Sequence, residues 1–96
     1  MPSSRYARGR LKEYRVKAEL ERRGYLVFRC AGSKPVDLIA FRRGLPPIFV
    51  EVRYGERPRK PSPEVEEKIA EVGGKYVVVL LKKGMRASEV LDSLGL

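Results

Sequence analysis

The stretch that decides the fold is residues 32–54, GSKPVDLIAFRRGLPPIFVEVRY. Two apolar runs, 36–40 and 48–54, are separated by a turn rich in glycine and proline, which predicts an antiparallel hairpin with a loop of several residues. Each run carries one acidic residue, Asp37 or Glu51, among apolar neighbours. Because a carboxylate is costly to bury without a cation, this pair indicates a cation site.

The second run alternates, so its side chains divide between two faces of the predicted sheet. Glu51 and Arg53 fall on one face together with Phe49, and the aliphatic residues between them fall on the other. Glu51 and Arg53 are therefore expected to be neighbours. This arrangement suits a catalytic site, but a purely structural salt bridge would use it as well.

The rest of the chain predicts helices and strands around this hairpin. A helix is expected over residues 4–23, ended by Gly24, and a strand over 25–31. Ser62 and Pro63 start a second helix, which Gly73 ends. The very apolar run 75–81 predicts a central strand buried on both faces, and residues 86–94 predict a last short helix. The predicted fold is a single α/β domain over residues 1–96, in the order αβββαβα with a mixed sheet flanked by helices, and with residues 1–4 disordered.

Composition excludes several classes of function. The 96 residues suffice for one hydrophobic core, and no apolar run reaches the roughly 18 residues that a membrane span requires. The absence of histidine excludes Ser-His and Cys-His catalysis and any histidine-based zinc site. A single cysteine cannot form an internal disulfide, and no signal peptide is evident, so a cytoplasmic protein is expected.

The formal net charge of +9 is the strongest compositional feature and indicates a polyanionic partner. A surface adapted to high temperature would explain many charges, but it explains an excess of one sign poorly. Nucleic acid is therefore the expected partner. The basic residues expected to follow its phosphate backbone are Arg8, Arg10, Lys34, Arg57, Arg59 and Lys60.

The spacing of Asp37, thirteen residues and then Glu51-Val52-Arg53 resembles the PD-(D/E)xK nuclease signature. Over roughly residues 5–82, the chain resembles the archaeal Holliday junction resolvases more specifically. The matching segments, in order, are Arg8-Gly9 with Glu13 and Arg22-Arg23-Gly24-Tyr25, then Val27-Phe28-Arg29 with Ala31-Gly32-Ser33-Lys34, then Val36-Asp37-Leu38-Ile39-Ala40, and finally Phe49-Val50-Glu51-Val52-Arg53.

The resemblance implies a restriction-endonuclease-like fold with a mixed sheet of about five strands. It implies that Glu13, Asp37 and Glu51 bind or orient a Mg²⁺ or Mn²⁺ ion, and that Ser33 lies near the scissile phosphate. Arg53 stands where that family has lysine and would assist at the phosphate. The implied activity is metal-dependent cleavage of branched DNA by a homodimer.

Two alternatives to a nuclease remain at this point. The first is a catalytically impaired paralogue that binds branched or duplex DNA without cutting it, because arginine is a poor substitute for lysine in positioning a water. The second is a basic protein associated with RNA or the ribosome, in which the buried acids are only structural.

Overall fold

The computed structural model describes residues 4–30, 36–54 and 63–96, with the backbone alone for residues 4–10. Three helices and four strands follow one another in the predicted order αβββαβα. They are α1 (Ser4–Arg22), β1 (Leu26–Arg29), β2 (Leu38–Phe41), β3 (Ile48–Tyr54), α2 (Pro63–Glu71), β4 (Lys75–Leu81) and α3 (Ala87–Ser93). None of the described helices combines the length and the apolar character needed to span a membrane.

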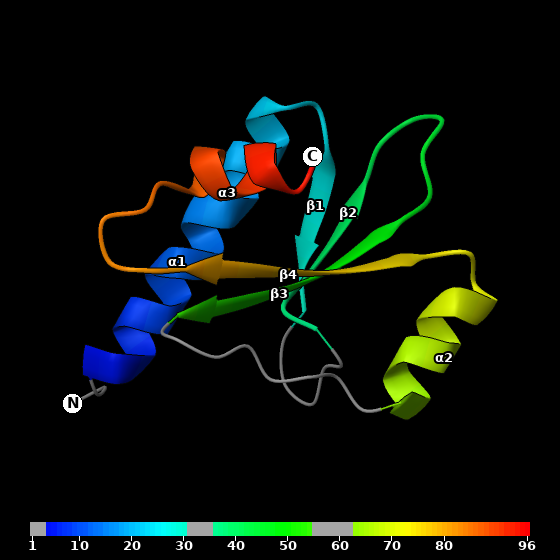
Figure 1. Cartoon of the computed structure of the whole chain (residues 1–96), viewed down its shortest axis with the longest axis horizontal. Helices are drawn as coiled ribbons and strands as arrows, with labels where there is room; N and C mark the ends of the chain where they lie inside the picture. Colours follow the sequence, from blue (N-terminus) through cyan, green and yellow to red (C-terminus); the bar gives the residue numbers. More distant parts are fainter. Residues whose placement is uncertain (1–3, 31–35, 55–62) are drawn as a thin grey trace.

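The four strands form one mixed sheet in the order β1-β2-β3-β4 (Figure 1). The predicted hairpin is confirmed, because β2 and β3 pair antiparallel with Leu38 opposite Val50. β4 then pairs parallel to β3 after the crossover through α2. The described part of the chain thus has one strand fewer than the roughly five predicted, because the chain after β4 turns into α3.

The hydrophobic core lies between the sheet and the two helices α1 and α3, which pack side by side on one face (Figure 1). Because successive strand residues point to opposite faces, each strand contributes every second side chain to this core. The fully buried side chains with the largest volumes are Leu20, Leu38, Leu91, Val16, Val36, Val50 and Val79.

The prediction that residues 75–81 form a central strand buried on both faces is wrong. β4 lies at the edge of the described sheet, and its residues alternate between buried and partly exposed. Val77, Val79 and Leu81 face the core, whereas Tyr76 and Val78 face the other side. The apolar run of residues 75–81 therefore forms a strand with one face buried in the core and the other face only partly covered.

The end of α1 is set by Gly24, as predicted from the sequence. Gly24 has a φ of +94°, which residues with a Cβ rarely adopt. The amide of Tyr25 donates to the carbonyl of Leu20 at 3.0 Å, and the amide of Gly24 donates to that of Glu21 at 3.0 Å. These two bonds satisfy helix-end carbonyls and turn the chain into β1.

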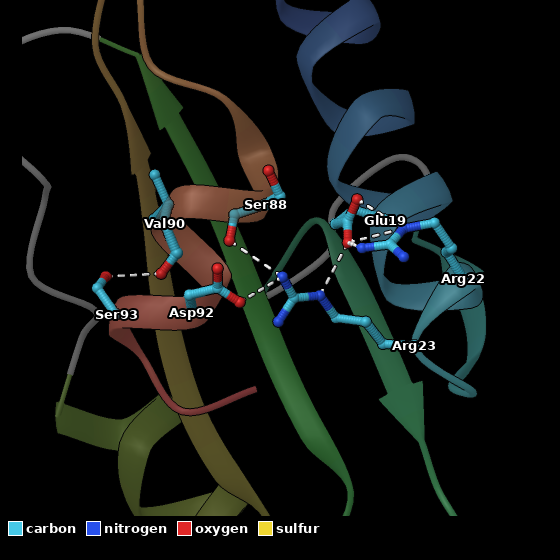
Figure 2. A network of polar contacts seen from close by, with 7 residues as sticks. All are labelled: Glu19, Arg22, Arg23, Ser88, Val90, Asp92 and Ser93. Atoms are coloured by element: carbon cyan, nitrogen blue, oxygen red, sulfur yellow. Dashed lines mark hydrogen bonds and ion pairs between the residues drawn. The ribbon is translucent and has the colours of Figure 1, made fainter.

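A polar network fastens α1 to α3 (Figure 2). The Arg23 guanidinium donates to Glu19 of α1 at 2.8 Å, to the Ser88 carbonyl at 3.0 Å and to Asp92 at 2.7 Å. Arg22 also donates to Glu19. Hydrogen bonds from both arginines hold the pKa of the Glu19 carboxyl at about 2, below its ordinary value of 4.5.

Candidate active site

Asp37 lies immediately before β2, and Glu51 lies on the neighbouring strand β3. The amide of Asp37 donates to the Val50 carbonyl at 3.0 Å, which holds the chain before β2 against β3. Both acids are buried, with exposures of 6% and 9%. One Asp37 oxygen, Oδ2, accepts a hydrogen bond from the Val52 amide at 2.8 Å. This bond fixes the Asp37 carboxylate against β3.

The Arg53 guanidinium bridges the two acids. Its Nη2 lies 2.6 Å from Glu51 Oε2, and its Nη1 lies 3.7 Å from Asp37 Oδ2. Nη1 also donates to the Val52 carbonyl at 3.4 Å. The prediction that Glu51 and Arg53 are neighbours on one face is thereby confirmed. Two carboxylates facing one guanidinium leave the cluster with an excess of one negative charge, which favours a further cation.

Tyr76 is a residue of this cluster that the sequence reasoning missed. In the parallel register, Phe49 pairs with Tyr76 and Glu51 pairs with Val78, so Tyr76 shares the face of Glu51. Burial, and secondly the nearby Glu51 carboxylate, raise the pKa of the Tyr76 hydroxyl to about 12. The hydroxyl oxygen is buried and lacks a hydrogen-bond partner of normal geometry among the described residues. The signal in the sequence that could have indicated Tyr76 is a single tyrosine within an otherwise aliphatic strand.

Glu13 does not join Asp37 and Glu51 in the described structure. Its carboxylate accepts a hydrogen bond from Arg29 at 3.1 Å. In the sheet, Arg29 lies opposite Leu38, and Leu38 lies opposite Val50. Arg29 and Val50 therefore share the face that carries α1, whereas Glu51 points to the opposite face. No group of three acidic or cysteine ligands forms within the described ranges. The role of Glu13 as a metal-orienting acid stays a prediction.

Several other predicted site residues cannot be placed. Ser33 and Lys34, and likewise Arg57, Arg59 and Lys60, lie outside the described residues. Arg8 and Arg10 lie on the first half of α1, where only the backbone is described. Their roles at the scissile phosphate and along the DNA backbone also stay predictions.

The donor set of the acid pair fits a hard divalent cation. Both carboxylates and the Val52 carbonyl contact the same guanidinium, that of Arg53. Mg²⁺ binds oxygen ligands and commonly uses one or two protein carboxylates, keeping waters at its other positions. Arg53 contacts the same three groups, so it competes for the oxygens that a cation would use.

A scan against known protein families finds no match for this chain. A segment of 45 residues is 49% identical to the crossover junction endodeoxyribonuclease Hjc of Methanocaldococcus jannaschii. The described fold superimposes on Hjc of Archaeoglobus fulgidus, a Holliday junction resolvase, with a TM-score of 0.59. The chain has the fold of an archaeal Holliday junction resolvase. The resemblance predicted from the sequence is thereby confirmed.

The extent of these similarities differs. The segment shared with the Methanocaldococcus resolvase covers 47% of this chain but 34% of that protein, so it spans about a third of its length. The structural match to the Archaeoglobus resolvase covers 76% of this chain and 67% of the other, at 24% identity. The second comparison concerns the fold alone.

Proposed function

We propose that the protein is a metal-dependent endonuclease of the Holliday junction resolvase kind, which hydrolyses phosphodiester bonds in branched DNA. The observation that carries this proposal is the pair of buried carboxylates, Asp37 just before β2 and Glu51 on β3, which contact the same Arg53 guanidinium. A pair of this kind is expensive to maintain for structure alone. The similarity to two archaeal resolvases supports the same reading.

In this proposal Asp37 and Glu51 hold a Mg²⁺ or Mn²⁺ ion. Such an ion would lower the pKa of a bound water and stabilise negative charge on the phosphate. The Val52 amide keeps the Asp37 carboxylate oriented, through the bond at 2.8 Å. Arg53 balances one of the two negative charges of the acid pair and is placed to offer its guanidinium to a phosphate oxygen. Glu13 and Ser33 are proposed to assist from α1 and from the chain before β2.

Arg53 also favours the main alternative, a paralogue that binds branched DNA without cutting it. Its guanidinium contacts both acids, and arginine does not release its proton to activate a water. In that case the acid pair and Arg53 form a structural cluster, and DNA would bind through basic residues elsewhere on the protein. Cleavage and binding must therefore be measured separately.

The test is a cleavage assay on a four-way DNA junction, labelled on each strand in turn. We expect cuts in two opposed strands in the presence of Mg²⁺ or Mn²⁺, and none in the presence of a chelator. A linear duplex of the same sequence serves as the control for structure selectivity. Tight binding without cleavage under any metal condition would replace the nuclease by the binding paralogue.

We also propose that the protein works as a homodimer in the cytoplasm. Exposed hydrophobic side chains gather on the sheet face opposite α1 and α3, at the paired strands β1 and β2. Leu26 pairs with Phe41 across these strands, and the Phe28 and Phe41 rings meet edge to face at 6.0 Å. Such an apolar patch on a small domain is typical of a protein interface. Two copies would supply two acid pairs for two opposed strands.

A further inference from the structure

A basic cleft of about 670 Å³ lies between α1 and the connection from β4 to α3. One wall is formed by α1 and the other by residues 82–88, with Tyr54 and Leu81 from the strand ends. The residues predicted from the sequence to contact DNA have side chains outside the described part of the chain, so the described lining of this cleft adds new candidates. Its basic side chains are Lys12, Arg15, Arg22, Lys82, Lys83 and Arg86.

The positive charges of this basic cleft are poorly compensated. Among the residues whose side chains the structure describes, six basic ones line it against a single acid, Glu19. Glu19 already accepts hydrogen bonds from Arg22 and Arg23. Within the described residues, no ion pair involves the other two arginines or the lysines of the cleft. Like charges held together in this way repel one another until an anion binds.

The spacing of the cations indicates an extended anion. Lys12, Arg15 and Arg22 recur on one face of α1 and span about 15 Å along its axis, at 1.5 Å per residue. Lys82, Lys83 and other basic groups of the connection line the opposite wall. A single phosphate group would occupy a small part of this length, whereas a sugar-phosphate backbone would follow it.

Lys12 is held at the cleft by an aromatic contact. Its Nζ lies 3.0 Å from the ring centroid of Tyr54, the last residue of β3. A cation–π contact fixes the ammonium group, and the protons that do not face the ring can still bind phosphate. Tyr54 and Glu51 are three residues apart on one strand and therefore point to opposite faces of the sheet. The basic cleft thus lies away from the acid pair.

We propose that this cleft binds the sugar-phosphate backbone of duplex DNA, as a contact surface separate from the acid pair. A branched DNA has several duplex arms, and this surface would hold one arm while the acid pair faces another. The inference goes beyond the proposed nuclease function, because it concerns binding and does not require cleavage. It also explains where part of the net charge of +9 acts.

The test compares two double variants with the same loss of charge. Lys82→Gln with Lys83→Gln removes two exposed cations of the cleft. Arg43→Gln with Lys75→Gln removes two exposed cations at the hairpin turn and at the start of β4, the opposite end of the sheet. Binding of a fluorescent four-way junction is measured by anisotropy from 50 to 200 mM salt, without divalent metal. Circular dichroism checks the fold of each variant.

We expect the cleft variant to bind at least about tenfold more weakly at 50 mM salt, because two phosphate contacts are lost. Raising the salt from 50 to 200 mM weakens binding by some factor in each protein. We expect this factor to be about ten times larger for the wild type than for the cleft variant. The control variant should follow the wild type more closely. Arg15→Gln, on the α1 wall, should likewise weaken junction binding and lower its salt dependence.

Equal salt slopes for the cleft variant and the control variant would overturn the proposal. So would release of the junction by inorganic phosphate at a concentration where sulfate of equal ionic strength has no effect, since the cleft would then bind a small anion. Preferential binding of an RNA duplex through the same lysines would overturn it as well. Because no metal is present, a protein without nuclease activity still gives a decisive result.

Discussion

Arg53 is the residue on which the chemistry of the acid pair depends. Its guanidinium contacts Glu51 at 2.6 Å, Asp37 at 3.7 Å and the Val52 carbonyl at 3.4 Å, so it acts as an internal cation. A divalent ion must compete with it for the same oxygens. Lysine carries a single compact ammonium group, which cannot span both carboxylates and the carbonyl with a planar fork.

Arg53→Lys should therefore bind Mn²⁺ more tightly than the wild type, by about tenfold, which corresponds to about 1.4 kcal/mol. Free Mn²⁺ measured by electron paramagnetic resonance, without DNA, gives the affinity directly. Arg42→Lys, on the exposed hairpin turn, is the matched control. Unchanged or weaker Mn²⁺ binding by Arg53→Lys would show that the guanidinium does not compete with the metal.

The raised pKa of Tyr76 leads to a second prediction for a single residue, about stability at alkaline pH. Its pKa is raised from 10.0 to about 12, so the folded state favours the neutral hydroxyl. This contribution to stability is complete below pH 10 and is lost as the pH rises towards 12. Urea unfolding of Tyr76→Phe should show a smaller loss of stability over this range than the wild type. Tyr54→Phe, at an exposed position, should behave like the wild type; equal losses in all three proteins would contradict the assignment.

At the scale of elements, the fastening of α1 to α3 depends on Glu19 and Arg23 (Figure 2). Because the folded pKa of Glu19 is lowered to about 2, its contribution is present above pH 4.5 and is lost as the pH falls towards 2. Glu19→Gln should be less stable than the wild type at pH 6 and should lose less stability on acidification to pH 2.5. Urea unfolding at the two pH values measures this difference.

The control for this prediction is Glu21→Gln, which removes an exposed acid two residues further along α1 that forms an ion pair with Lys17 at 3.1 Å. It should follow the wild type at both pH values. An equal loss of stability on acidification in Glu19→Gln and the wild type would mean that the network does not stabilise the fold.

The elements also show what sequence patterns can predict. The β2–β3 hairpin, the end of α1 at Gly24 and the start of α2 at Pro63 follow from local signals and are confirmed. The edge position of β4 could not be predicted, because burial of a strand depends on how many neighbours the whole chain supplies. The Glu13–Arg29 pair was likewise out of reach, since it joins residues sixteen positions apart across two elements. Tyr76 reaches Glu51 only through the parallel register of β3 and β4.

At the scale of the whole molecule, the proposed homodimer rests on the apolar face of β1 and β2. Phe28 is 53% exposed and Phe41 is 42% exposed, although both rings are large and apolar. Replacing both by serine should leave a monomer, because the apolar area that would be buried is removed. Sedimentation velocity at several concentrations measures the mass.

Val72→Ser, at a residue that is 65% exposed beyond the end of α2, is the control for this change. It should sediment like the wild type. A wild-type protein that is monomeric at all concentrations, or a dimer unchanged by the two serine substitutions, would contradict this interface.

The most direct test of the central claim is junction cleavage by Asp37→Asn. Asparagine can still accept the bond that the Val52 amide donates to Asp37, so the fold should persist while one charge proposed to bind the metal is lost. Glu67→Gln, at an exposed position of α2, is the matched control. We predict that wild type and Glu67→Gln cut a four-way junction with Mg²⁺ or Mn²⁺, whereas Asp37→Asn binds it and cuts at least about a hundredfold more slowly, a loss of about 2.7 kcal/mol in transition-state stabilisation. Equal cleavage by Asp37→Asn and the wild type would show that the acid pair is not the catalytic centre.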